Sequence, residues 1–382
     1  MPRASSYKRS RDSANPTDSI GSSVNNLNSK PLTDRQKSIA LVEKGRRAKW
    51  WQRKGSPSRG FSYRDRDGKR ISSEETLERI KGLVIPPAWR LVRISPAPTS
   101  KIQAVGVDTI GRVQYLYNLK FAESQQRKKF AKIERFGEYL PRLRQITSEH
   151  VSLDGFPRDK VLAIMIRLIN SLYMRMGAEL SVKRYKTYGI TTLKNRHLEI
   201  RRNGELVFQF VGKSGVKQRK VLVDEELAGL MNELRQLGAS RKLFHYIDDD
   251  GKPRAIRPSD INQYIKSITA PEFSAKDFRT WGATLLAAVQ LAENGIAESE
   301  AETKKSIVRA VRFVAEQLGN TPTVCRSSYI HPLVIKAYTS GVTIEHFQPR
   351  DKRRARRIES GVEPEEESLL KLFNEWRNGS GH

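Results

Sequence analysis

Three cationic residues and one tyrosine stand where a turn or a helix end would fix them. Arg175 lies in a helix-like stretch before a glycine, Lys213 at the tip of an expected hairpin, Arg279 in the first turn of a capped helix, and Tyr329 in a short helix delimited by prolines. These side chains suit transesterification at a phosphodiester without a metal ion. Tyrosine can store the bond energy as a covalent phosphotyrosine. Arginine binds two phosphate oxygens at once, and a lysine crowded by phosphate can protonate the leaving oxygen.

Motifs of other enzyme classes are absent from the sequence. It has no Gly-x-x-x-x-Gly-Lys-[Ser/Thr] loop, no His-Glu-x-x-His and no acidic cluster of the kind that binds two catalytic metal ions. Its six histidines are scattered and Cys325 is its one cysteine, so neither a zinc site nor an internal disulfide is expected. We therefore expect no cofactor, neither ATP nor a metal ion.

The charge of the chain indicates a polyanionic partner. Its 382 residues include 70 Lys and Arg against 42 Asp and Glu, a formal net charge of +28 at pH 7. Nucleic acid is the commonest polyanion in a cell. No stretch approaches the roughly 18–20 apolar residues of a membrane helix, and Met1–Ser10 has no apolar centre for a signal peptide. We expect a cytoplasmic protein without membrane contact.

The elements that position these residues begin after a basic leader. Residues 1–60 carry 14 Lys and Arg against 4 Asp and Glu, and their Ser-, Asn- and Pro-rich first half predicts a largely disordered segment. Near its end, Trp50 and Trp51 follow a basic run. They suit either packing on the next domain or direct contact with DNA, and the sequence leaves both open.

Residues 61–136 predict a small β-rich domain. A helix is expected over 74–83, stopped by Pro86 and Pro87, and the alternation over 102–117 predicts a β-hairpin. A charged tail, residues 341–382, ends the chain; we interpret it as an appendage. We hypothesise that its basic run 352–357 and the leader add nonspecific phosphate contacts.

Residues 137–340 predict a mainly α-helical domain with one β insert. Apolar side chains recur at helical spacing along most of it, and the turns Asn203-Gly204 and Gly212–Gly215 indicate two hairpins. The expected elements are strands at 197–201, 205–211 and 217–223, helices at 224–237, 258–267 and 302–318, a helix begun by the capping box Ser274–Asp277, and a short helix after Thr321-Pro322.

Six segments in order resemble the small type IB DNA topoisomerases of the poxviral and bacterial kind. The resemblance covers about residues 60–340. The segments are Ile85–Trp89, Gly106–Tyr117, Tyr188–His197, Phe210–Lys213, Lys276–Gly282 and Asn320–Pro332. A single block would be weak evidence, whereas six blocks in the family's order are very unlikely to arise by coincidence.

The resemblance implies a role for each candidate residue. Tyr329 would be the nucleophile that bonds to a 3′ phosphate and frees a 5′ hydroxyl, with Arg175 and Arg279 on the scissile phosphate and Lys213 protonating the leaving oxygen. Asn320 stands where some members have His; an amide can donate a hydrogen bond but cannot act as a charged acid.

The sequence does not decide which arginine joins Arg279 at the scissile phosphate. Arg167 and Arg184 lie close to Arg175 in the sequence, and the match around Arg175 is short.

The resemblance also implies how DNA is bound. Gln114, Tyr115 and Tyr117, on the expected exposed face of a hairpin, match positions that meet the major groove, and Lys276 would be a further DNA contact. The fold class would be α+β, a small N-terminal β-rich domain and a helical catalytic domain with a three-stranded insert. Together they would form a C-shaped clamp on double-stranded DNA. A monomer associated with the nucleoid is expected.

Two other functions stay open from the sequence. A tyrosine recombinase uses the same Arg, Lys and Tyr chemistry, although such enzymes usually have His-x-x-Arg where this chain has Lys276-x-x-Arg279. A non-enzymatic nucleoid-binding protein would need only the positive charge. The implied activity is instead relaxation of positive and negative supercoils without ATP or metal.

Overall fold

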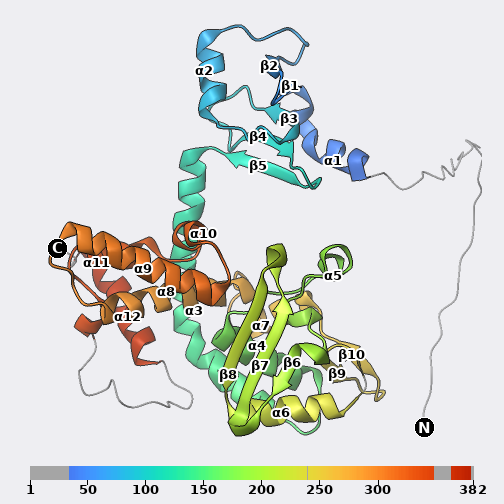
Figure 1. The fold of residues 1–382 in the computed structure, drawn as a ribbon, viewed down its shortest axis with the longest axis vertical. Helices are drawn as coiled ribbons and strands as arrows, with labels where there is room; N and C mark the ends of the chain where they lie inside the picture. Colours follow the sequence, from blue (N-terminus) through green and yellow to red (C-terminus); the bar gives the residue numbers. More distant parts are fainter. Residues whose placement is uncertain (1–33, 239, 348–362, 380–382) are drawn as a thin grey trace, which may run out of the picture. The chain divides into compact units, whose positions relative to one another are not determined.

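The computed structural model describes residues 34–238, 240–347 and 363–379 (Figure 1). The chain divides after Glu123 into two compact units. It combines an N-terminal β-sheet with a helical core, which confirms the predicted α+β class. Within the described residues, no helix has both the length and the apolarity to cross a membrane.

The first unit is a five-stranded antiparallel sheet of order β2-β1-β3-β4-β5 with a helix against it. Ile80 of the helix packs with Val92, Ile94 and Ala104 on one face of the sheet. The elements are α1 (Asp34–Val42), η1 (Gly45–Lys49), β1 (Trp51–Ser56), β2 (Gly60–Arg64), α2 (Glu74–Gly82), β3 (Arg90–Ile94), β4 (Ile102–Val107) and β5 (Val113–Tyr117).

The prediction that a leader through residue 60 precedes the β-rich domain is wrong for the second half of that leader, which belongs to the domain itself. Residues 34–60 form α1, η1 and β1, and β1 lies inside the sheet between β2 and β3. Trp51 packs against the Ile80 cluster, and Trp50 packs beside Val42 and Val105. The packing alternative for the two tryptophans is therefore correct. Strand β1 was difficult to predict because only one of its faces is covered, and lysine and arginine therefore stand between its apolar residues. Residues 1–33 and the run 352–357 lie outside the described residues.

The second unit contains the remaining elements and a large core. Its long first helix, α3 (Leu119–Val151), begins in the last residues of the first unit, well before residue 137, where the helical domain was expected to start. The others are α4 (Arg158–Leu172), α5 (Glu179–Tyr185), η2 (Ile190–Thr192), η3 (Asn195–His197), β6 (Leu198–Ile200), η4 (Arg202–Gly204), β7 (Glu205–Val211), η5 (Lys213–Gly215), β8 (Lys217–Val223), α6 (Glu225–Gln236), β9 (His245–Ile247), β10 (Pro253–Ala255), α7 (Pro258–Ile268), α8 (Ala275–Glu293), α9 (Glu300–Leu318), α10 (Pro322–Ser328), α11 (Pro332–Thr339), η6 (Ile344–Phe347) and α12 (Pro364–Arg377).

Two helices, α4 and α8, form the centre of this core. In α4 every residue from Val161 to Ile166 is fully buried, so the helix has no polar face there. The indole of Trp281 on α8 packs directly on α3 at Gly137, where an added Cβ would lie 2.3 Å from the ring. Larger side chains at Gly137 would therefore push α8 away from α3.

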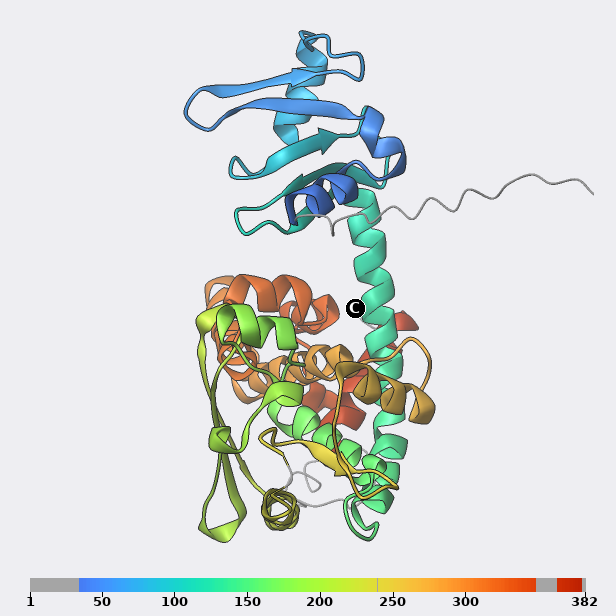
Figure 2. The same cartoon turned by 90° about the vertical axis from the view of Figure 1, so that its right-hand side faces the viewer.

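The β insert has the predicted strands and turns. β6, β7 and β8 form an antiparallel sheet, and β7 and β8 make a long ribbon (Figure 2). Asn203 and Gly204 have φ of 60° and 70°, and Ser214 and Gly215 have φ of 63° and 77°. These left-handed residues match the twist of a tight hairpin. The second turn carries Lys213 at its tip.

The interpretation of the C-terminal tail as an appendage is wrong for α12. Leu369, Leu372 and Phe373 are buried in the main core. Glu366 is only 3% exposed; its carboxylate accepts two hydrogen bonds from Arg144 on α3, of 2.7 and 2.9 Å, and one from Trp281 Nε1 at 3.2 Å. An acidic sequence around a few apolar residues looks like a solvated tail until these partners, more than 80 residues away, are known.

Glu366→Gln is expected to lower the free energy of unfolding by about 3 kcal/mol, because the partly buried Arg144 guanidinium would lose the buried carboxylate that it binds. Glu367→Gln is the matched control, since Glu367 forms an exposed i,i+4 pair with Lys371 that is worth under about 1 kcal/mol. Urea denaturation of both variants measures the difference. Equal losses would contradict a structural role for the Glu366 carboxylate.

Candidate active site

Arg279 is held one turn into α8 by the predicted capping box. The Asp277 carboxylate accepts hydrogen bonds from Ser274 N at 2.8 Å and Ser274 Oγ at 3.1 Å, and it pairs with Lys132 at 2.6 Å. The Arg279 guanidinium donates to the carbonyl of Tyr173 and, at 2.8 Å, to that of Leu318. Two chain segments far apart in sequence thus fix this guanidinium.

The buried Arg279 guanidinium is suited to bind an anion. Arg279 is 4% exposed, and burial together with the nearby charge of Arg175 lowers its pKa to about 10. Among the described residues, Arg279 Nε and Asn320 Nδ2 are buried without a hydrogen-bond partner. Buried donors without partners are costly. A phosphate would offer acceptors to both donors and a countercharge to the arginines.

Arg175 approaches this site from a loop. The helix-like stretch expected around it is wrong, because α4 ends at Leu172 and Tyr173 follows in the left-handed conformation, with φ 51°. The Tyr173 ring covers α8 at Gly282, where a Cβ would lie 2.0 Å from the ring. This packing turns the chain so that Arg175 reaches Asn320 Oδ1 and donates a hydrogen bond to it.

Arg167 and Arg184, the alternatives to Arg175, lie elsewhere. Arg167 pairs with Glu226 at 2.6 Å and donates to Ser148 Oγ at 3.0 Å. Arg184 belongs to α5. Of the three arginines, only Arg175 lines the pocket that also holds Lys213 and Asn320.

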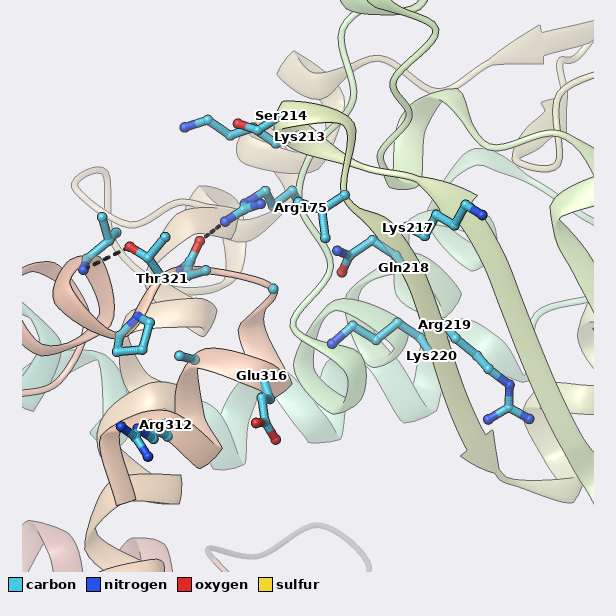
Figure 3. Close-up of a pocket in the computed structure, with 16 residues that line it drawn as sticks. Arg175, Lys213, Ser214, Lys217, Gln218, Arg219, Lys220, Arg312, Glu316 and Thr321 are labelled. Carbon is cyan, nitrogen blue, oxygen red and sulfur yellow. Dashed lines mark hydrogen bonds between the residues drawn. The ribbon is translucent and has the colours of Figure 1, made fainter. Parts of the chain in front are cut away.

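That pocket has a volume of about 740 Å³ and lies between the β7–β8 turn and the C-terminal end of α9 (Figure 3). Its lining includes Lys213, exposed at the turn, Arg175, and Asn320, which follows the left-handed Gly319 at the end of α9. A smaller adjoining recess is lined by Arg175, Lys213 and Arg279 together. The structure therefore brings the three predicted cations and the amide to one place.

Tyr329 stands beside this group at the end of α10. Thr321 caps the helix and Pro322 begins it, as predicted, but Tyr329 is the residue after the last turn, with φ −129° and ψ −36°. Its half-buried ring lies 5.5 Å from the Arg279 guanidinium carbon. Thr284 Oγ1 donates to the Tyr329 carbonyl at 3.2 Å. Tyr329 thus lies beside Arg279 but is not among the residues that line the pocket or the recess. Cys325 is buried below it, and burial raises the pKa of its thiol.

Comparison with known proteins identifies the family. Residues 118–355 match the family model described as eukaryotic DNA topoisomerase I, catalytic core, and residues 60–108 match bacterial DNA topoisomerase IB, N-terminal domain. The chain belongs to the type IB DNA topoisomerase family. It is a DNA topoisomerase, an isomerase whose substrate is DNA, as the sequence predicted.

Viral relatives support the same assignment. DNA topoisomerase 1B of Acanthamoeba polyphaga mimivirus is 31% identical over 295 residues, which cover 75% of this chain and 87% of the relative. DNA topoisomerase 1 of Rabbit fibroma virus (strain Kasza) is 24% identical over 74% of this chain and 90% of its own. DNA topoisomerase 1B of Vaccinia virus (strain Copenhagen) is 24% identical over 61% and 71%. These matches do not favour a recombinase or a non-enzymatic binding protein.

The hairpin residues expected to meet DNA are divided between two faces of the topoisomerase sheet. The prediction that Gln114, Tyr115 and Tyr117 share an exposed face is wrong, because neighbouring residues of a strand point to opposite sides. Tyr115 and Tyr117 are stacked with ring centres 6.2 Å apart, and only Tyr117, at 48%, is largely exposed. Gln114 Nε2 donates to Asp108 Oδ2 at 3.0 Å. Lys276 is exposed in the first turn of α8, close enough to Lys129 to lower the pKa of that lysine.

Lys220 lies in the candidate site of the topoisomerase, and sequence reasoning missed it. It lines both the pocket and the adjoining recess, and its ammonium donates to the Gln317 carbonyl. Burial and the charges of Arg279 and Arg175 lower its pKa to about 8. The alternation of β8 turns Lys220 inward, whereas Lys217 and Arg219 point the other way (Figure 3). The sequence contains this alternation but does not reveal what faces it.

Lys220→Met is expected to raise the melting temperature of the DNA-free topoisomerase at pH 7 by about 2–4 °C. The folded pKa, about 8, lies below the unfolded value of about 10.4, so the charged form is penalised. This penalty is fully present below pH 8 and fades as the pH rises to about 10.4. The advantage of the variant should therefore shrink between pH 8 and 10.

Calorimetry at pH 7 and pH 9.5 measures this difference. Lys217→Met is the control: Lys217 also lines the pocket, but its side chain points to the other side of β8 from Lys220. DNA cleavage by Lys220→Met should be about tenfold slower, because the pocket loses one cation. A lower melting temperature at pH 7 would show that the Gln317 contact outweighs the repulsion between Lys220 and the arginines.

Proposed function

We propose that this topoisomerase relaxes positive and negative supercoils by nicking one strand through Tyr329. The Tyr329 oxygen attacks the phosphorus, and the bond from phosphorus to the 5′ oxygen breaks. The phenol proton is lost to water, and the Lys213 ammonium gives a proton to the 5′ oxygen. A 3′-phosphotyrosyl bond and a 5′ hydroxyl result, and the reverse reaction reseals the strand without ATP.

The observation that carries this proposal is the buried donor group around Arg279. Arg279 Nε and Asn320 Nδ2 have no partner among the described residues, and the Tyr329 ring lies beside the guanidinium. Burial, and after it the charge of Arg175, lowers the pKa of Arg279. A phosphate held there would stand next to a tyrosine. Fixed donors of this kind stabilise charge that develops on the non-bridging oxygens.

Lys213 is proposed as the acid because it stands at the tip of a turn. It is exposed, lines the same pocket as Asn320 and stands in the turn that joins β7 to β8. Asn320 supplies a neutral hydrogen-bond donor to a non-bridging oxygen. Gln114, Tyr115, Tyr117 and Lys276 are proposed as DNA contacts outside the reaction centre, with Tyr117 the most exposed of the three hairpin side chains.

We also propose that the first unit, which contains most of the expected domain 61–136, binds DNA and that the second unit, which contains the expected domain 137–340, performs catalysis. One chain would act alone at the nucleoid in the cytoplasm. The net charge of +28 supports retention on DNA, and one chain contains every proposed catalytic group. Sedimentation of the free protein should give the mass of one chain.

The experiment is relaxation of plasmids of either supercoil sign in chelator, without ATP, followed by denaturant to trap a covalent protein–DNA adduct. Relaxation of both plasmids and an adduct at the 3′ end of the nick are expected. A requirement for ATP or magnesium, or an adduct at the 5′ end, would overturn the proposal.

A further inference from the structure

One face of α3 contacts the chain on both sides of Tyr329. Gln126 Nε2 donates to the Ser327 carbonyl at 3.1 Å, and the Lys129 ammonium donates to the Ser328 carbonyl. Residues at i, i+3 and i+4 lie on one helical face, so the next contact falls to Phe130. The Phe130 ring packs against His331 with ring centres 4.8 Å apart.

The same face continues to Glu134. Glu134 Oε1 lies 3.2 Å from His331 Nε2, and His331 Nδ1 accepts from Leu333 N at 3.1 Å. Residues 327–331, the tyrosine segment, are thus held by α3 before and after Tyr329. All of these contacts lie within the second compact unit.

The tyrosine segment needs such support because α10 is short. It has seven residues, and helices of that length are marginal alone. The last carbonyls of a helix have no partner within it. Gln126 and Lys129 satisfy two of them, and a cation at this end also matches the helix dipole. The rotation of Tyr329 about the end of α10 is therefore limited by α3.

Lys129 also brings a charge close to the Tyr329 ring. Its ammonium lies 5.9 Å from the ring centre, and the Arg279 guanidinium carbon lies 5.5 Å from it. Two cations near the ring favour negative charge on the phenol oxygen, which develops as Tyr329 attacks phosphorus. Sequence reasoning missed Lys129, since it lies within a long basic helix.

We propose that Lys129, assisted by Gln126, is a positioning residue that holds the end of α10 and aims Tyr329 at the scissile phosphate. This inference rests on the proposed nucleophilic role of Tyr329. Lys129 acts through the Ser328 carbonyl and the ring, without touching DNA. Its removal should therefore slow cleavage and leave DNA affinity unchanged.

The charged groups around Lys129 give the proposal a second readout. Burial and the nearby Lys276 and Lys132 lower the Lys129 pKa to about 8, against the opposing effect of Asp277. Arg279 and Tyr329 are its other neighbours across the ring. Lys129 loses its charge as the pH rises through 8, whereas arginine at this position would keep it. The cleavage rate of Lys129→Arg relative to wild type should therefore rise between pH 7 and pH 9.

The experiment measures single-turnover cleavage by the full chain on a DNA substrate whose cut strand cannot be resealed, at saturating DNA. Lys129→Met should cleave at least tenfold more slowly than wild type. Lys128→Met, the same change at the exposed neighbouring residue, should stay within twofold. DNA affinities of the two variants should be equal, and Lys129→Arg should recover most of the rate at pH 7.

The melting temperature of each variant shows whether it is folded. Gln126→Ala removes only an exposed contact, so it should keep the wild-type melting temperature and slow cleavage about threefold. Equal rates for Lys129→Met and Lys128→Met would overturn the proposal. So would a defect that appears only as weaker DNA binding, because Lys129 would then be a phosphate contact. A wrong assignment of the nucleophile gives a different result, because Tyr329→Phe would then still form the covalent protein–DNA adduct.

Discussion

Tyr329→Phe is expected to lower DNA cleavage at least about 10⁴-fold and to leave no covalent adduct. The change removes only the phenol oxygen. The ring can keep its place 5.5 Å from the Arg279 guanidinium carbon, and the hydrogen bond from Thr284 Oγ1 to the Tyr329 carbonyl involves the backbone. Because the surroundings stay intact, a lost adduct reports the lost nucleophile. DNA binding should stay within about twofold of wild type.

The matched control is Tyr246→Phe. Tyr246 is a partly buried tyrosine on β9 that packs against the same core, and it does not line the candidate site. Single-turnover cleavage and denaturing gels of both variants give the comparison. An adduct formed by Tyr329→Phe would require another nucleophile and would refute the proposed reaction.

Arg279→Ala is expected to slow cleavage about 10³-fold, the second-largest effect, since one lost donor to a developing oxyanion typically costs about 10²–10³-fold. Arg279→Lys should recover little of this loss. The three N–H groups of lysine share one nitrogen, so they cannot reproduce the planar fork that reaches the Leu318 and Tyr173 carbonyls and leaves Nε for a phosphate. The rate should fall without a matching loss of DNA affinity, because many other cations bind the DNA backbone.

Arg235→Ala, at the C-terminal turn of α6, removes the same charge away from the site and should change cleavage less than twofold. Melting temperatures separate a missing donor from a damaged core, because Arg279 is buried. Arg279→Lys retains a cation and most of the side-chain volume. If it cleaved at the wild-type rate, the guanidinium geometry would have no role.

The local elements of the catalytic unit were largely predictable from the sequence. Strands β7 and β8, the turns that contain Gly204 and Gly215, and the caps at Ser274 and Thr321 depend on periodicity and on residues close in the chain. Such signals survive in the sequence because their cause is local. Arg175 and Asn320 are 145 residues apart in the chain, so only the resemblance to the family indicated that they belong to one site.

Errors arose where packing partners are far apart in the chain. Strand β1 and helix α12 have charged sequences, and each is stabilised by a face that only distant elements cover: Ile94 pairs with Trp51, and Arg144 binds Glu366. Charge composition alone suggested solvated tails. Gln114 and Tyr115 were wrongly expected on one face of the strand. They are adjacent in the sequence, and adjacent residues of a strand point to opposite faces, so the sequence itself could have shown the error.

What the sequence by itself determined is the reaction class: a tyrosine, two arginines, a lysine and an amide in the order of one family, on a chain of net charge +28. What only the tertiary structure decided is which neighbours act on them. Lys220 meets the arginines because β8 turns it inward, and Lys129 meets Tyr329 because α3 packs along the tyrosine segment. Both lysines look like ordinary basic residues in the sequence. Burial and electrostatic coupling depend on distances in space, and packing of distant elements sets those distances.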